Sequence, residues 1–144
     1  MSLSVDLNGM PPLVREFSSY KLSIQGCSQK TVNEYLLDIR TFFRYIFAVR
    51  AGISPESDEF TEIDISGADI KFISGITNED IYEFLMYSGT VRKNLWSAKA
   101  RKLSAIKAFF KYLTVKRKLL ETNPAIDIES PKAKKTLPKF IRSE

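Results

Sequence analysis

The segment 97–113 has the periodicity that most restricts how this chain can fold. Its large apolar residues recur at three- and four-residue steps, which places them on one face of an α-helix. These residues are Leu103, Ile106, Phe109, Phe110 and Leu113. The opposite face carries residues that are either basic or small, namely Ser97, Arg101, Ser104, Ala108 and Lys111. The pattern therefore predicts an amphipathic helix that buries one face and presents a basic one.

The charge around this helix has a single sign. No Asp or Glu lies between Tyr87 and Leu120, whereas acidic residues dominate the segment 50–85. A helix that needs only solubility normally mixes both signs, while one that lies against phosphates gains from a single sign. The net charge of +5 is modest, so it is the uneven distribution that indicates a polyanion-binding face. Nucleic acid is the first candidate ligand.

The composition excludes several classes of site. A chain of 144 residues suits one domain, and it contains no His, which removes Ser-His-Asp and Cys-His catalysis and most zinc sites. Its one cysteine, Cys27, cannot form an internal disulfide and indicates a reducing, cytoplasmic environment. No apolar run approaches the ~20 residues that span a bilayer. We therefore expect no membrane segment, metal, cofactor or small-molecule substrate.

Two further helices are predicted before the acidic segment. Pro11 and Pro12 suit the start of the first and Gly26 its end, and Ser28 is the expected N-cap of the second. The first should bury Leu13, Phe17, Tyr20 and Ile24. The second, which runs to about Val49, should bury Val32, Tyr35, Leu36, Ile39, Phe42, Phe43 and Ile46. Its opposite side carries Lys30, Asn33, Leu37, Thr41 and Arg44, with Arg40 on the flank.

The segment 52–75 is predicted to be a long acidic connection. Periodicity does not decide whether residues 62–65 are extended or whether residues 68–73 form one or two helical turns. Thr77 and Asp80 resemble a capping box, with Asp in place of the usual Glu, for a third helix that ends near Gly89. Asn123-Pro124 is expected to end the helical region, after which Ile126 and Ile128 close the core.

Three stretches, in this order and spacing, resemble the N-terminal core-binding (SAM-like) domain of tyrosine recombinases, the phage-integrase and Xer group. The first is Ser28-x-x-Thr31-x-x-x-Tyr35-x-x-Asp38-Ile39-x-x-Phe42. The second is Arg101-x-Leu103-Ser104-Ala105-Ile106-Lys107-x-Phe109-Phe110-x-Tyr112-Leu113, followed by Asn123-Pro124. The third is Pro131-Lys132 with Leu137-Pro138, which is similar to the linker that precedes the catalytic domain in this family.

The resemblance implies an all-α fold, a four-helix orthogonal bundle with the acidic connection between helices 2 and 3. Residues 1–10 would be a flexible arm, 11–129 the DNA-binding domain and 130–144 a basic linker toward a C-terminal catalytic domain that this chain lacks. Such a domain forms half of a C-shaped clamp on duplex DNA, with its second and fourth helices toward the major groove. The chain would not be an enzyme itself, while its full-length parent would break and rejoin DNA together with other recombinase protomers.

The resemblance also implies which residues contact DNA. Lys30 and Thr31 would contact phosphate from the second helix, and Lys99, Arg101, Lys102 and Ser104 would lie at the groove from the fourth. The linker lysines Lys132, Lys134 and Lys135 would follow the backbone. Asn33, Arg40 and Arg44 on the polar side of the second helix complete the candidate set, and base reading would fall to a few side chains such as Arg101 or Asn33.

One alternative of a different class stays open. The chain could be a helical protein-interaction module that docks through the acidic segment 52–75, with lysines that only solvate its surface. The spacing argues against a helix-turn-helix regulator, because its two helices are joined by a short turn and the two basic helices here are far apart in sequence. Salt separates the two hypotheses that remain, since a protein making six or more phosphate contacts loses about 10³-fold or more in affinity between 50 and 200 mM salt.

Overall fold

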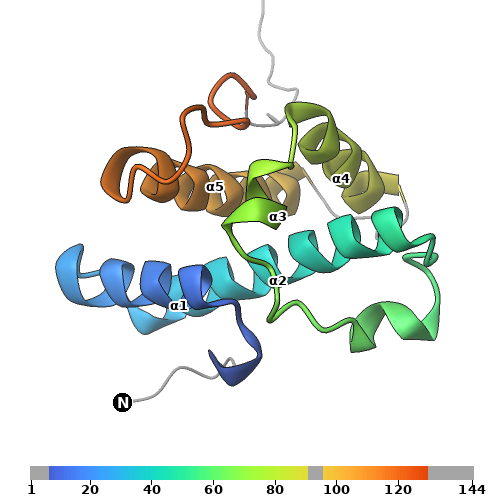
Figure 1. Ribbon diagram of the computed structural model, residues 1–144, viewed down its shortest axis with the longest axis horizontal. Helices are drawn as coiled ribbons and strands as arrows, with labels where there is room; N and C mark the ends of the chain where they lie inside the picture. Colours follow the sequence, from blue (N-terminus) through green and yellow to red (C-terminus); the bar gives the residue numbers. More distant parts are fainter. Residues whose placement is uncertain (1–6, 91–95, 130–144) are drawn as a thin grey trace, which may run out of the picture.

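In the computed structural model, residues 7–90 and 96–129 are described, and this part of the chain is helical without any strand (Figure 1). A turn at Leu7–Gly9 (η1) leads into α1, Pro12–Ser19, which widens into a π-helical turn at Tyr20–Ile24 (η2). The following helices are α2, Gln29–Ala51; α3, Ile70–Ser74; α4, Asn78–Thr90; and α5, Trp96–Lys111. A 3-10 turn at Asp58–Glu62 (η3) precedes α3, and a second π-helical turn at Tyr112–Lys116 (η4) ends α5. The predicted all-α fold is confirmed.

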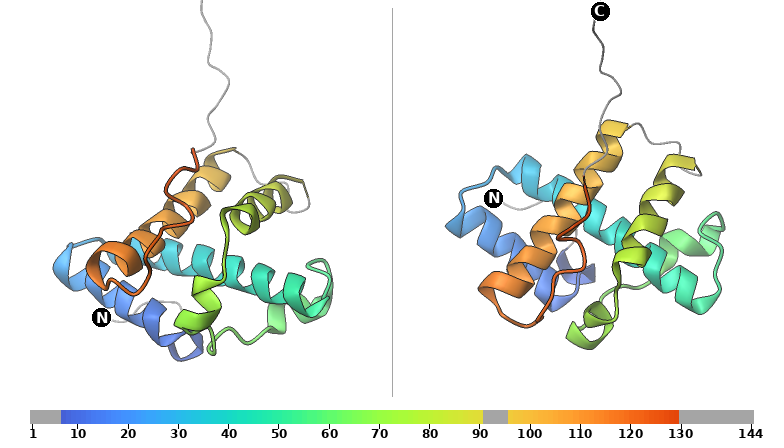
Figure 2. Two further views of the ribbon diagram at one scale, coloured as in Figure 1. Left: turned by 45° about the horizontal axis from the view of Figure 1, so that its top comes forward. Right: turned by 90° about the horizontal axis from the view of Figure 1, so that it is seen from above.

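The four predicted helices correspond to α1, α2, α4 and α5. The 23-residue α2 is the centre of the arrangement, because α1, α4 and α5 all contact it. In the view from above, α5 crosses α2, and the N-terminal end of α5 and the short α3 lie on opposite sides of α2 (Figure 2). Of the predicted arm 1–10, only residues 7–10 are described, and Met10 among them is buried.

The helix starts that the sequence predicts are present. Ser28 caps α2, because its Oγ accepts a hydrogen bond from the Thr31 N–H at 3.1 Å. At α4 the Thr77 N–H donates to Asp80 Oδ2 at 2.9 Å, and the Asp80 N–H donates to Thr77 Oγ1 at 3.2 Å. These reciprocal bonds satisfy two backbone donors that the helix itself leaves free. The shorter Asp is therefore sufficient to complete the capping box.

Two helix ends differ from the expected positions. α4 continues one residue past Gly89, to Thr90. The helical region, which is expected to end at Asn123-Pro124, ends earlier at Lys116, because Lys118 takes a left-handed conformation with φ of 53°. The Leu119 N–H then donates to the Leu113 carbonyl at 2.9 Å, which satisfies one of the last helical acceptors in the manner of a C-cap. A lysine gives no sequence signal for such a stop, since glycine is the usual residue there.

An aromatic cluster joins the four long helices. The Phe109 ring of α5 lies 5.4 Å from that of Phe17 in α1 and 5.8 Å from that of Phe43 in α2, both in edge-to-face contacts. The Phe42 ring of α2 lies 5.1 Å from that of Phe84 in α4. Edge-to-face aromatic pairs stabilise by about 0.5–1.5 kcal/mol beyond the area they bury. The predicted apolar stripe of α2 is confirmed, with Tyr35 half-buried at its edge.

The predicted buried face of the first helix is only partly correct. Phe17 is buried as expected, but Val14 is buried as well, and Ile24 is 74% exposed. The π-helical turn at Tyr20–Ile24 has more residues per turn than an α-helix, so Ile24 rotates away from the face that Phe17 defines. At the other end of the chain Ile128 is buried as predicted, while Ile126 is 69% exposed.

The acidic connection is packed against the bundle. Phe60 of η3 and Ile65 are buried, and α3 is capped by Asp69, whose Oδ1 accepts from the Phe72 N–H at 2.9 Å. The Phe72 ring stacks on that of Phe47 in α2 with centroids 4.3 Å apart. Of the possibilities left open, the helical turns are present, whereas residues 63–65 form no regular element. The segment therefore places its apolar residues inward and its acids outward.

Replacing Leu103 by Ala tests the packing of α5. Leu103 is fully buried, so we expect a loss of about 2–5 kcal/mol in the free energy of unfolding, measured by urea denaturation. Ile126→Ala is the matched control, because its side chain is mostly exposed and should change stability by less than about 0.5 kcal/mol. Equal effects of the two substitutions would show that Leu103 does not face the core and that α5 is rotated about its axis.

Candidate nucleic-acid interface

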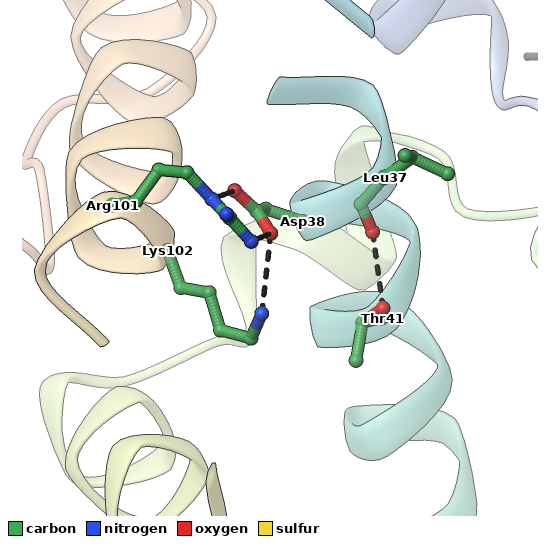
Figure 3. A network of polar contacts seen from close by, with 5 residues as sticks. All are labelled: Leu37, Asp38, Thr41, Arg101 and Lys102. Atoms are coloured by element: carbon green, nitrogen blue, oxygen red, sulfur yellow. Dashed lines mark hydrogen bonds and ion pairs between the residues drawn. The ribbon is translucent and has the colours of Figure 1, made fainter. Parts of the chain in front are cut away.

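A buried carboxylate joins α2 to α5. The Asp38 side chain is 2% exposed and accepts two hydrogen bonds from Arg101, Nε to Oδ2 at 2.9 Å and Nη2 to Oδ1 at 3.0 Å (Figure 3). Lys102 Nζ donates to the same Oδ1 at 3.3 Å. Asp38 lies at the border between the buried and polar sides of α2, which is why a carboxylate there can reach both cations. We call these three residues the Asp38 network.

The geometry of this network makes it a strong contact. Bidentate Arg–carboxylate pairs are shorter and stronger than neutral hydrogen bonds, and they fix the plane of the guanidinium. The hydrogen bonds that Arg101 donates to Asp38 raise the pKa of Arg101 above its ordinary value, and the charges of Asp38 and Glu34 act in the same direction against the effect of burial. Removing one partner of a buried ion pair is costly, because the remaining charge loses its compensation.

The predicted site residues of α5 do not all face the same way. Ser104 is exposed and the Arg101 side chain is 45% exposed, so both remain at the surface. Lys102 is 5% exposed, and its predicted place at the DNA groove is corrected, because one step along a helix turns its side chain by about 100° toward α2. The Lys99 side chain packs against Gly89 of α4. A Cβ atom added to Gly89 would lie only 3.1 Å from Lys99 Nζ.

The predicted site residues of α2 form a polar, partly shielded row. Lys30 is exposed, and Thr31 is half-buried beside its cap. Leu37 and Thr41 lie on the same side of the helix, with the Thr41 hydroxyl donating to the Leu37 carbonyl at 3.0 Å (Figure 3). Asn33, Arg40 and Arg44 are half-buried as well.

Two arginines of this row form no ion pair with the described residues. Arg40 Nε and Arg44 Nε are buried and have no hydrogen-bond partner among the described residues, and the same holds for Asn33 Oδ1. Desolvation lowers the pKa of the Arg44 guanidinium, and the positive charge of Arg40 one turn away lowers it further. Buried donors without partners are rare in proteins, and each one costs free energy. Both residues are half-buried, so an anion at the surface would pair with the accessible part of their guanidinium groups.

The Asp38 network joins α2 to α5 at one edge of the polar side of α2, where the Asp38 carboxylate meets the partly exposed Arg101 guanidinium. At about 100° per residue, Arg40 lies about 160° and Arg44 about 120° around α2 from Asp38. The contact therefore places Arg101 against α2, but on the flank away from these two arginines. The linker lysines Lys132, Lys134 and Lys135 lie outside the described residues.

The described residues contain neither a metal-binding cluster nor a membrane-spanning helix. No group of three or more His, Cys, Asp or Glu side chains among them could hold a metal ion. Within the same residues, no helix has the length and apolar character needed to cross a membrane.

Comparison with known proteins adds an independent line of evidence. The chain is 34% identical over 134 residues to the tyrosine recombinase XerC of Caldanaerobacter subterraneus. The aligned region covers 93% of this chain and 38% of that protein. The XerC protein of Myxococcus xanthus is 32% identical over 139 residues, and that of Leptospira interrogans 25% identical over 128 residues. The chain belongs to the tyrosine recombinase family. It corresponds to the N-terminal part of such a recombinase and spans less than two fifths of the length of these relatives.

Two further comparisons gave no match. Neither a protein-family model nor a solved structure matched the chain significantly. The assignment to the recombinases therefore rests on the curated relatives, together with the ordered motifs and the helical fold.

The role of Asp38 was not predicted, although the residue stands in the recombinase motif. The sequence contained a signal for this role. Asp38 is an acid at the edge of the apolar stripe of α2, and the charged residues of α5, which packs against α2, are all Lys or Arg. The sequence also does not predict that Lys21, Lys111 and Lys116 lie together, although Lys111 is on the predicted basic face, because periodicity alone does not bring the ends of two helices together.

Substitution of Asp38 tests the network. Asp38→Ala leaves the buried Lys102 ammonium without a counter-charge, so we expect a loss of about 3–5 kcal/mol in the free energy of unfolding, measured by urea denaturation. Lys102→Met approximately retains the side-chain volume and leaves Asp38 paired with Arg101, so its loss in the free energy of unfolding should be clearly smaller than that of Asp38→Ala. Similar losses in the two variants would contradict a network centred on Asp38.

Proposed function

We propose that this chain is the DNA-binding, core-binding domain of a site-specific tyrosine recombinase. In this proposal it clamps duplex DNA, and a C-terminal catalytic domain of the full-length protein carries out strand exchange. The observation that carries the proposal is the pair Arg40 and Arg44, half-buried on α2 with no hydrogen-bond partner for Nε among the described residues, together with the partly exposed Arg101, which Asp38 holds against the same helix. Its partners are double-stranded DNA and other recombinase protomers bound to the same DNA.

The chemistry of this face suits a DNA backbone more than a protein surface. Arginine presents several donors in a planar fork that matches phosphate oxygens, and it is more weakly hydrated than lysine. Each phosphate neutralised releases counterions, so the affinity of such a face falls steeply with salt. The small residues Ser104 and Ala108 next to Arg101 allow α5 to approach a groove closely. Phosphate contacts would supply most of the affinity, and the few side chains at the centre would read bases.

The alternative, a protein-docking module, has one observation in its favour. Glu56, Asp58, Glu59 and Glu62 are exposed, and their carboxylates pair with none of the described side chains. The same segment buries Phe60 and Ile65 against the bundle, however, so the surface it offers is charged and lacks an apolar anchor. Stable protein interfaces usually centre on buried aromatic or other large side chains. The acidic surface therefore supports this alternative less well than the basic face supports DNA binding.

Ser104→Glu tests the proposed DNA face. A pair of charges 4 Å apart interacts by about 1–4 kcal/mol between water and a protein surface, so a carboxylate facing phosphates should weaken binding at least about fivefold. Binding is measured by fluorescence anisotropy on a duplex selected from a random pool. Double substitution of Arg101 and Lys102 by Ala is unsuitable here, because it would leave the buried Asp38 unpaired.

Ser74→Glu is the matched control for this measurement. Ser74 is exposed on α3, on the other side of α2 from the start of α5, so the same new charge should leave DNA affinity nearly unchanged (Figure 2). If both variants weaken binding equally, the effect comes from net charge and the assigned face is wrong. A chain that binds no duplex at low salt would reject the proposed function.

A further inference from the structure

A basic cleft lies where α1 and α5 end. It has a volume of about 370 Å³ and opens to solvent between the two π-helical turns η2 and η4. One wall is formed by Tyr20, Lys21 and Gln25, and the other by Lys111, Tyr112 and Lys116. The ends of α1 and α5 lie at the same end of the molecule in both orientations (Figures 1 and 2).

The lysines of this cleft have no carboxylate partner among the described residues. Lys21 Nζ donates to Gln25 Oε1 at 2.7 Å and lies 5.7 Å from the ring centres of Phe17 and Tyr35. Lys116 Nζ lies 5.9 Å from the ring centre of Tyr20. Amide and aromatic contacts of this kind hold an ammonium in place without neutralising it.

The nearest acid on α1 is already occupied. Glu16 Oε1 accepts hydrogen bonds from Arg117 and from the Tyr112 hydroxyl, and the Arg117 bond ties the end of α5 to α1. The cleft therefore combines a fixed framework with three unneutralised ammonium groups. This contrasts with the Asp38 network, in which a carboxylate compensates the cations.

The cleft continues the proposed DNA face of α5. Ala108 and Lys111, which line it, follow Ser104 at four and seven residues and so lie on the same side of the helix. Seven residues at 1.5 Å each separate Lys111 from Ser104 by about 10 Å along the helix axis. That distance corresponds to roughly three base-pair steps of 3.4 Å along one DNA strand.

We propose that this cleft binds a backbone phosphate of the duplex, beside the groove that α2 and α5 face. The inference rests on the proposed function and adds a contact outside the family-implied set of residues. Lysine binds phosphate as a point charge, and the Gln25 amide and the Tyr20 hydroxyl supply further hydrogen-bond donors for phosphate oxygens. The expected ligand is a phosphodiester, and the contact does not depend on base sequence.

Lys111→Gln combined with Lys116→Gln tests the cleft. Both side chains are exposed, so the fold should be preserved, which circular dichroism checks. The slope of log affinity against log salt for duplex DNA should become shallower by about 0.9 for each phosphate that the variant no longer neutralises. Lys71→Gln on α3 is the control, because it removes an exposed lysine far from the cleft and should leave the slope unchanged.

Ethylation interference then locates the contact. In the wild-type chain, ethylation of one phosphate next to the site covered by α5 should reduce binding, and that signal should be absent in the double variant. If the double variant shows the same salt slope and the same interference pattern as the wild type, the cleft does not bind a phosphate and this inference is overturned. Weaker binding by Ser104→Glu would in that case still support the proposed function. A wild-type chain without salt-dependent affinity would overturn both.

A different occupant of the cleft gives a different result. The acidic segment of a second copy of the chain is the main competitor, because its carboxylates are exposed and unpaired among the described residues. In that case sedimentation velocity would show self-association that the double variant abolishes, with no change in its affinity for DNA. This outcome would overturn the phosphate assignment.

Discussion

The packing of α2 against α5 depends on the carboxylate of Asp38. It is nearly inaccessible to water and lies between two cations of the neighbouring helix, so the two helices can hardly slide or rotate against each other without breaking charged contacts. Apolar packing around Phe43 and Phe109 supplies most of the contact, but apolar surfaces alone tolerate small changes of register. The charged contact therefore sets the relative orientation of the two faces that are proposed to meet DNA.

This network also changes where positive charge is available. Sequence alone places the strongest basic cluster at the start of α5, yet Lys102 is buried against Asp38 and Arg101 is bound to it. Among the described residues, the cations that pair with no carboxylate include Arg40 and Arg44 on α2 and the lysines of the cleft between η2 and η4. In the proposed interface, the counter-charge therefore weakens the attraction of Arg101 and Lys102 for an anion relative to that of these unpaired cations.

Much of the fold could be predicted because it depends on local chemistry. The apolar stripe of α2, its cap at Ser28 and the capping box at Thr77 follow from residue spacing, and all are present. The predictions that were wrong concern long-range contacts or unusual backbone geometry. The π-helical turn that exposes Ile24 and the left-handed Lys118 have no periodic signal. The burial of Lys102 could not be predicted from charge, because it requires knowing which residue of α2 lies opposite.

The bidentate pair leaves Arg101 only part of its donors. A guanidinium has five N–H groups, and Asp38 accepts from Nε and from Nη2. The remaining N–H groups stay in a plane fixed by the carboxylate, so the side chain has lost its rotational freedom before any ligand arrives. A base or phosphate that meets Arg101 would encounter a rigid donor with one direction of approach, and selectivity at this position would come from angle as much as from charge.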